Sequence, residues 1–135
     1  MVSDGILDDE YAATTFGALE SDPSGKGQHE SGAKLDAGKN RLGLVLLSFS
    51  RALNEVGVVG TYGADKYTDN GWLAVDNAEE RYTDAMFRHL LASKIEGEVD
   101  ADSGLLHKAQ MAWNALAVLE LFLIDLEDDA KEAVR

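Results

Sequence analysis

The sequence contains no cysteine. Disulfide frameworks, thiolate metal sites and thiol nucleophiles are therefore excluded, and any metal ion must bind through oxygen or nitrogen ligands. Because disulfides are typical of secreted proteins, their absence fits an intracellular setting. We expect a cytoplasmic protein.

Basic residues are scarce, with 12 lysines and arginines against 25 aspartates and glutamates and a formal net charge of −13. Binding along a phosphate backbone needs a basic stripe that displaces counterions. The composition therefore argues against a nucleic-acid duplex as partner. A small phosphate ligand remains compatible with it.

Long apolar runs are also lacking. The two longest, 42–49 and 115–124, are shorter than the roughly 20 residues that a membrane span needs. No charged segment followed by an apolar one opens the chain, as a secretory signal would. We expect a soluble protein without a membrane partner.

The 135 residues, 45% of them hydrophobic, are enough for one core. The charge pattern divides the chain into an acidic flexible arm (1–33), a helical domain (34–126) and a charged tail (127–135). The arm has one apolar patch, Tyr11 and Phe16, that could dock on the body or on a neighbouring subunit.

The first helix is predicted over 48–67, where apolar and small residues recur at helical spacing. Three glycines in it, Gly57, Gly60 and Gly63, lower its helix propensity by about 1 kcal/mol each. They indicate either close helix packing or a ligand that approaches bare backbone.

The second helix is predicted from about Asn77 to Glu96, because Asp76 and Glu79 have the spacing of a capping box. The third is predicted from about Gly104 to Leu126, capped by Ser103 or Asp102. It is apolar in nearly every direction, which is typical of a buried helix.

The expected fold is an all-α bundle of three main helices with short accessory segments and an irregular acidic arm. A bundle of this size leaves part of the third helix uncovered, so we expect a homo-oligomer.

A polar stripe, His107, Gln110 and Asn114, interrupts the third helix. Buried polar groups need partners, because an unpaired one costs about 1–3 kcal/mol. One alternative is an internal hydrogen-bond network in which His89 pairs with Asn114 or His107. The other joins the stripe to three preceding carboxylates, Glu98, Asp100 and Asp102, which could hold Mg²⁺ or Mn²⁺. A solvated acidic loop fits the carboxylate spacing equally well.

Several short motifs occur in order: KLDAGKNRLGL (34–44), TYGADKY (61–67), NGW (70–72), RYTDAMFRHL (81–90) and GEVDADSGLLHKAQMAWNAL (97–116). Together they resemble the phage and bacterial dATP/dGTP diphosphohydrolase N-terminal domain family. Asp102 stands where that family usually has Glu, and Gln110 where it has a second His. The paired Glu-x-x-Glu and Glu-x-x-Asp signature of MazG-like pyrophosphatases is absent.

The resemblance implies hydrolysis of a purine deoxynucleoside triphosphate (dNTP) to dNMP and pyrophosphate with Mg²⁺ or Mn²⁺, in the host cytoplasm if the protein is phage-encoded. Hydrolysis at the α-phosphate needs neutralised phosphate oxygens and a positioned water. The metal ligands would be Glu98, Asp100 and Asp102, and the catalytic residues His89 and His107. The nucleotide would be bound by Lys34, Lys39, Arg41, Tyr62, Gly63, Lys66, Tyr67, Asn70, Trp72, Arg88 and Asn114.

Structural interpretations remain open beside these roles. Trp72 could be a core anchor rather than a base-stacking residue, and 34–41 could be a flexible basic lead-in. At the level of function, one alternative is a non-catalytic nucleotide-binding protein, either a regulatory subunit or a sponge that sequesters a nucleotide. The other is a structural interaction protein whose polar stripe only fixes helix register.

Overall fold

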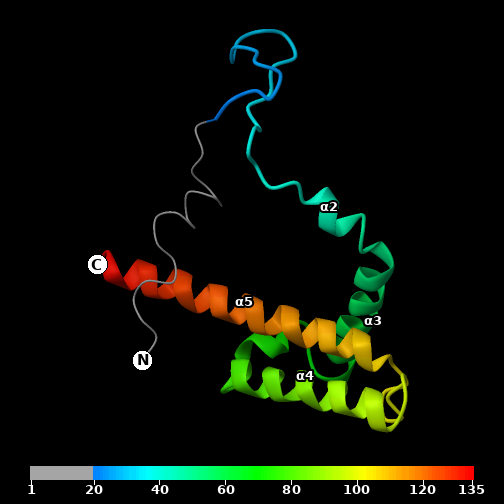
Figure 1. Cartoon of the computed structure of the whole chain (residues 1–135). Coiled ribbons are helices and arrows are strands. Elements are labelled where there is room, and N and C mark those ends of the chain that lie inside the picture. The colour runs from blue at the N-terminus through cyan, green and yellow to red at the C-terminus, as the bar shows by residue number, and fades with distance from the viewer. Residues whose placement is uncertain (1–19) are drawn as a thin grey trace. The chain divides into compact units, whose positions relative to one another are not determined.

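The computed structural model describes residues 20–135, and over this range the chain is all-α, as predicted. Its elements are α2 (Gly43–Leu46), α3 (Ser50–Lys66), the 3₁₀ helix η1 (Gly71–Ala74), α4 (Ala78–Ile95) and α5 (His107–Ala133) (Figure 1). Between 20 and 135 the only β pairing is a single antiparallel bridge, Val99 with Leu106. Residues 1–19, with the apolar patch at Tyr11 and Phe16, lie outside the described part.

The chain divides into two units, 1–48 and 49–135. In the first, residues 20–42 form turns rather than helix. The Asp22 carboxylate organises these turns by accepting hydrogen bonds from the Ser24 hydroxyl, the Ser24 N–H (2.7 Å) and the Lys34 N–H (2.7 Å). These bonds lower the pKa of Asp22 to about 2, and the bond from the Ser24 hydroxyl has the largest effect.

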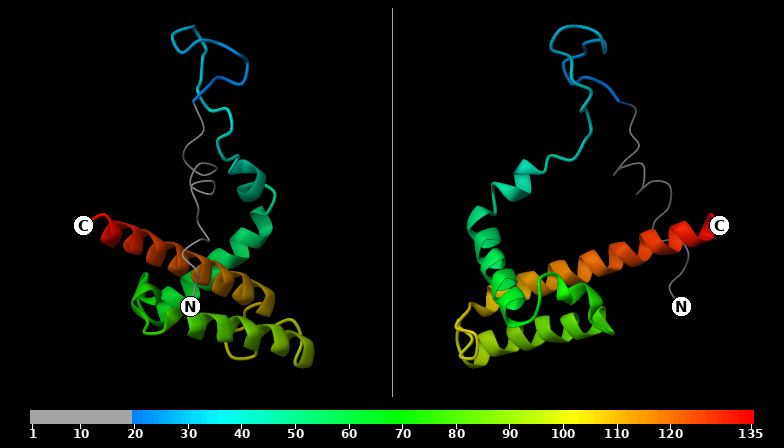
Figure 2. Two further views of the ribbon diagram at one scale, coloured as in Figure 1. Left: turned by 60° about the vertical axis from the view of Figure 1, so that its left-hand side comes forward. Right: turned by 180° about the vertical axis from the view of Figure 1, so that it is seen from behind.

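In the second unit, α4 and α5 lie side by side and antiparallel, and α3 crosses α5 (Figure 2). The buried apolar residues here are all small: Ala78, Ala109 and Ala117. Larger side chains pack beside them in a half-buried aromatic cluster. The Trp72, Tyr82 and Trp113 rings meet edge to face with centroids 5.5–6.4 Å apart.

Of the three glycines in α3, Gly60 is the one that faces α5. A Cβ at Gly60 would lie 3.4 Å from the indole nitrogen of Trp113, which is ordinary van der Waals contact. A Cβ at Gly57 or Gly63 would meet nothing within 4 Å. Close packing therefore requires none of the three glycines.

The helices were predicted in the right order, but the capping box predicted for α4 and the start predicted for α5 were wrong. No capping box forms at α4, because Asn77 is the N-cap in a left-handed conformation (φ 52°) without a side-chain cap. Asp76 therefore stands one residue too early to cap. Similarly, α5 begins at His107 rather than Gly104, and neither Ser103 nor Asp102 caps it. It runs on to Ala133, so most of the predicted charged tail is helical.

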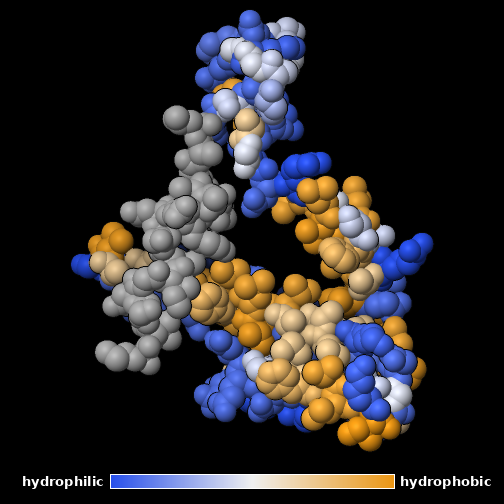
Figure 3. Space-filling model, in the orientation of Figure 1, coloured by the Kyte–Doolittle hydropathy of each residue, from blue (hydrophilic) through white to orange (hydrophobic). Residues whose placement is uncertain are grey.

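The third helix is apolar in nearly every direction, and part of it was expected to stay uncovered within a single chain, as the structure confirms. One side of α5 is covered, but Leu116, Leu119 and Phe122 are 49%, 53% and 37% exposed. Figure 3 shows hydrophobic residues at the surface along α5 and α3. By length and composition, α5 is also the one helix in the described range that could cross a membrane, a test that core helices of soluble proteins pass as well.

Candidate functional site

The polar groups of the second unit gather where the C-terminal half of α4, the loop 96–106 and the first turns of α5 meet. The loop is closed by backbone bonds on both sides of the Val99–Leu106 bridge. The His107 N–H donates to the Glu98 carbonyl (2.9 Å), and the Asp100 N–H donates to the Leu105 carbonyl (2.8 Å). This short closed loop delays the start of α5 until His107.

A histidine pair joins the two helices. Nδ1 of His89 on α4 lies 2.9 Å from Nδ1 of His107 on α5, so one ring nitrogen donates and the other accepts. Of the two partners predicted for His89, the structure therefore confirms His107. Burial, and then the neighbouring His107, lower the pKa of His89. His107 is only 2% exposed, and its Nε2 is buried without a hydrogen-bond partner in residues 20–135.

The Asp100 carboxylate is the centre of a second set of bonds. It accepts from the Ser103 hydroxyl (2.8 Å), the Asp102 N–H (3.1 Å) and the Gln110 side-chain amide (3.3 Å). Burial alone would raise the pKa of Asp100, but these three bonds together outweigh it and lower the pKa to about 2. Asp100 is therefore ionised at neutral pH, and its charge orders the loop.

The polar stripe on α5 belongs to this network. Gln110 also donates to the Ser103 hydroxyl (3.2 Å), and Asn114 donates to the Gln110 backbone carbonyl (2.7 Å). Gln110 and Asn114 are 9% and 6% exposed, so both are buried, as the stripe predicted. The internal hydrogen-bond network is thus confirmed, and it includes one of the loop carboxylates.

The three predicted metal ligands are not gathered in one place. Glu98 forms an ion pair with Lys108. The hydrogen bond from Lys108 makes the largest contribution to lowering the pKa of Glu98. Asp100 is engaged by the groups named above, and Asp102 is exposed. Between residues 20 and 135, no three histidine, aspartate or glutamate side chains are grouped as a metal ion would need. As arranged here, the donor set does not fit a preformed cation site.

The predicted nucleotide-binding residues fall into separate groups. Lys34, Lys39 and Arg41 lie in the first unit, where the Lys34 and Lys39 ammonium groups are 3.5 Å from Asp36 and Glu20 carboxylate oxygens. These exposed ion pairs are weak and exchange readily with a competing anion.

A second group lies at the end of α3, with Gly63 on the same helical turn. The Lys66 ammonium is 5.9 Å from the centroid of the Tyr62 ring and 5.3 Å from that of Tyr67. The pKa of Lys66 is raised, mostly by a hydrogen bond with Tyr67 and to a smaller extent by the charge of Asp102. One cation and two aromatic faces are thus brought together.

The remaining nucleotide-binding candidates are dispersed. Asn70 occupies a left-handed turn before η1 (φ 55°), and Arg88 is exposed on α4. Trp72 packs edge to face in the aromatic cluster, as a core anchor would, and Asn114 is committed to Gln110. Ser103 was expected only as a helix cap, and its role as a partner of Asp100 was missed. The Asp-x-x-Ser spacing in a turn is the signal that could have shown it.

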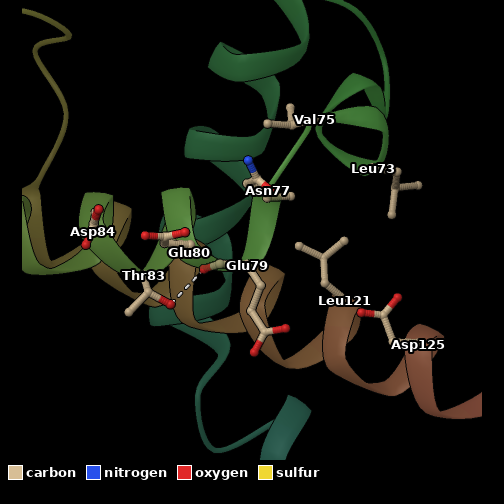
Figure 4. A pocket seen from close by; sticks show the side chains of 10 residues that line it. Leu73, Val75, Asn77, Glu79, Glu80, Thr83, Asp84, Leu121 and Asp125 are labelled. Atoms are coloured by element: carbon tan, nitrogen blue, oxygen red, sulfur yellow. Dashed lines mark hydrogen bonds between the residues drawn. The ribbon is translucent and has the colours of Figure 1, made fainter.

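Two open grooves lie away from the histidine pair. The one in Figure 4, of about 630 Å³, is lined by Leu73, Val75 and Leu121 and by four carboxylates, Glu79, Glu80, Asp84 and Asp125. Such a rim repels a triphosphate. The other, of about 700 Å³, lies between α3 and Leu105 and includes Tyr62 and Asp65.

A family model described as dATP/dGTP diphosphohydrolase, N-terminal, matches residues 29–131. The chain belongs to this family. The matched range contains the histidine pair, the acidic loop and the basic residues of the first unit, and it confirms the resemblance found in the motifs. No curated protein and no solved structure matches the chain.

Proposed function

We propose that this chain hydrolyses purine dNTPs to dNMP and pyrophosphate, or is the domain of an enzyme that does so. The observation that carries the proposal is the family match over 29–131, because this range includes every residue of the polar network. The network supplies what such chemistry needs, namely ionisable groups held by fixed partners between two helices.

The histidine pair has two tautomers, which give His89 different roles. If His89 donates through Nδ1, then His107 must carry its hydrogen on Nε2, which is buried without a partner. Orphaned buried N–H groups are rarer than orphaned acceptors. We therefore assign the other tautomer, in which His107 donates to His89.

In this tautomer Nε2 of His89 carries a hydrogen and can donate it to a phosphate oxygen or to the attacking water. His107 holds the ring of His89 in place. A donor fixed before the reaction stabilises developing charge more effectively than one that must reorganise. His89 is thus the residue that would touch the substrate, and His107 is a positioning residue.

The triphosphate and base would be bound outside this network. Lys66 with Tyr62 and Tyr67 offers a cation beside aromatic faces, which suits a phosphate chain next to a base. Within the second unit, Arg88 would supply further positive charge, and Gly63, Asn70 and Trp72 would line the base and sugar site. Lys34, Lys39 and Arg41, exposed on the first unit, would offer a separate set of cations for a triphosphate.

We propose that turnover requires Mg²⁺ or Mn²⁺, which would neutralise charge on the phosphate oxygens. Glu98, Asp100 and Asp102 remain the proposed ligands. Glu98 would first have to release Lys108, and Asp100 would have to release part of its network.

The proposal includes self-association. The apolar core of the second unit is small, whereas large hydrophobic side chains are exposed on α3, α4 and α5. Exposed apolar surface of this extent is typical of a protein–protein contact. The expected assembly is a homo-oligomer.

One observation favours a second candidate function, a nucleotide-binding protein without turnover: the carboxylates are occupied by internal partners rather than grouped for a metal. Incubation with each dNTP and Mg²⁺ or Mn²⁺, followed by chromatography, separates the two functions. Hydrolysis predicts dNMP and pyrophosphate, and His89→Gln should slow it at least tenfold while His29→Gln, in the first unit, should not. A dNTP-dependent thermal shift without any product would indicate binding alone.

A further inference from the structure

Apolar residues recur at alternating intervals of three and four along the uncovered side of α5. They are Ala112, Ala115, Leu119, Phe122 and Leu126. This is the spacing of the contact seam in a two-helix coiled coil. At 3.6 residues per turn, the seam lies on the opposite side of the helix from the buried Gln110 and Ala117.

The seam is both exposed and apolar. Leu119 is 53% exposed, Leu116 beside it is 49% exposed, and Ala112 and Ala115 are exposed as well. The same three-and-four spacing reaches Lys108 before the apolar stretch and Asp129 after it. One edge of α5 is thus a continuous apolar strip, which ends at Asp129 on one side and on the other at Lys108, paired with Glu98 of its own chain.

We propose that a second copy of this chain covers the strip, with the two α5 helices antiparallel and the two-fold axis at Leu119. An antiparallel two-fold pairing is self-complementary, because the same surface serves both subunits. It puts Leu119 against the partner's Leu119, and Ala112 against the partner's Leu126. Small side chains at one end therefore meet large ones from the other, which lets the layers interdigitate.

Charge favours the antiparallel direction over the parallel one. The C-terminal part of α5 carries five acidic residues, Asp125, Glu127, Asp128, Asp129 and Glu132. A parallel pair would place two such segments side by side, where like charges repel. An antiparallel pair separates these segments, and it places the Lys108–Glu98 ion pair of one chain near the partner's Asp129.

The strip is long enough for a stable contact. From Lys108 to Asp129 it spans 22 residues, or about 33 Å at 1.5 Å per residue. With Leu116 and Leu123 on its flank, a helix pair of this length covers on the order of the 800 Å² per partner found in standard interfaces. The contact needs no bending of the helix, because α5 is already straight (Figure 2).

A membrane is the less favourable occupant of the strip. Insertion of α5 would take His107, Gln110 and Asn114 into lipid, away from partners such as His89 and Asp100. Buried polar groups without partners are costly in a bilayer. The net charge of −13 also opposes approach to anionic lipid.

This interface rests on the self-association proposed above and not on the nucleotide chemistry, so a failed dNTP assay leaves it standing. Because the chain has no cysteine, single introduced cysteines report proximity cleanly. Under mild oxidation, full-length Leu119→Cys should form a disulfide-linked dimer on a non-reducing gel. The matched control is Leu91→Cys, on the exposed side of α4 and 60% exposed, which should remain monomeric on the same gel.

Direction is tested by two further variants. Ala112→Cys alone should not crosslink, whereas Ala112→Cys mixed with Leu126→Cys should give the heterodimer. Crosslinking of Ala112→Cys with itself would show a parallel pair and overturn the proposal.

Light scattering completes the test. At tens of micromolar, the unmodified chain should be dimeric, and Leu91→Glu should remain dimeric. Leu119→Glu should be monomeric, with a helical circular dichroism spectrum equal to that of the unmodified chain. A monomeric unmodified chain, or equal crosslinking of Leu91→Cys and Leu119→Cys, would refute the interface. A monomer that co-sediments with phosphatidylcholine vesicles would assign the strip to a membrane instead.

Discussion

Replacing Asp100 by asparagine should destabilise the protein, because the carboxylate accepts three hydrogen bonds in the loop before α5. The asparagine amide has the same shape but offers one acceptor oxygen and a donor nitrogen. In either orientation of the amide, at least one of the Ser103, Asp102 and Gln110 donors then faces another donor. A lost bond to a charged acceptor costs about 1.5–3 kcal/mol.

The same hydrogen bonds make the stability of the protein depend on pH. The network lowers the pKa of Asp100 from 3.8 to about 2, so the unfolded chain binds this proton more tightly than the folded one. The associated stability is fully present above pH 3.8 and is lost as the pH falls through about 2. After allowance for solvent around a half-buried carboxylate, the shift corresponds to roughly 1–2 kcal/mol.

Urea unfolding at pH 7 and pH 3, followed by circular dichroism, measures both effects. Asp100→Asn should be less stable than the unmodified chain by about 1.5–3 kcal/mol at pH 7, and by less at pH 3. The matched control is Asp102→Asn, in the same loop, whose exposed side chain makes none of these bonds. Equal stability of Asp100→Asn and the unmodified chain at pH 7 would refute the reasoning.

Three further predictions follow from the contacts described. The pKa of His89 is lowered from 6.5 by burial and then by His107. The stability that depends on this group should therefore be full above pH 6.5 and fall as the pH drops through the lowered pKa. Between pH 8 and 5, the melting temperature of His89→Gln should fall by less than that of the unmodified chain. Gly57→Ala should raise the unfolding free energy by up to about 1 kcal/mol through helix propensity, because its Cβ meets nothing. Gly60→Ala should gain at least as much, because its Cβ adds an ordinary contact with Trp113; a loss of stability in urea unfolding would contradict the spacing of α3 and α5. Lys39→Ala with Arg41→Ala should weaken dNTP binding in calorimetry without changing the melting temperature by more than a degree or two, and unchanged affinity would remove these residues from the triphosphate site.

The sequence predicted the helices through their periodicity, and it offered His107 as one of two hydrogen-bond partners for His89, because these residues lie on neighbouring helices. The cap of α4 and the start of α5 were harder, because they depend on single backbone conformations. The left-handed Asn77 and the closed loop before His107 leave no mark in the hydrophobic pattern.

The candidate site shows the same limit. That Glu98 pairs with Lys108, ten residues away, depends on how the loop closes, and sequence spacing alone offered Glu98 as a metal ligand instead. The exposed strip of α5 was not separable from its buried side, because the helix is apolar in nearly every direction. Only the packing of α3 and α4 against one side distinguishes them.

The most direct test of the central claim is the conversion of dATP and dGTP by the purified full-length chain with Mg²⁺ or Mn²⁺, with nucleotide products and pyrophosphate resolved by chromatography. We predict dNMP and pyrophosphate in equal amounts, at a rate that falls at least tenfold in His89→Gln. Intact dNTP after prolonged incubation with either metal, from a chain that remains folded by circular dichroism, would contradict the account.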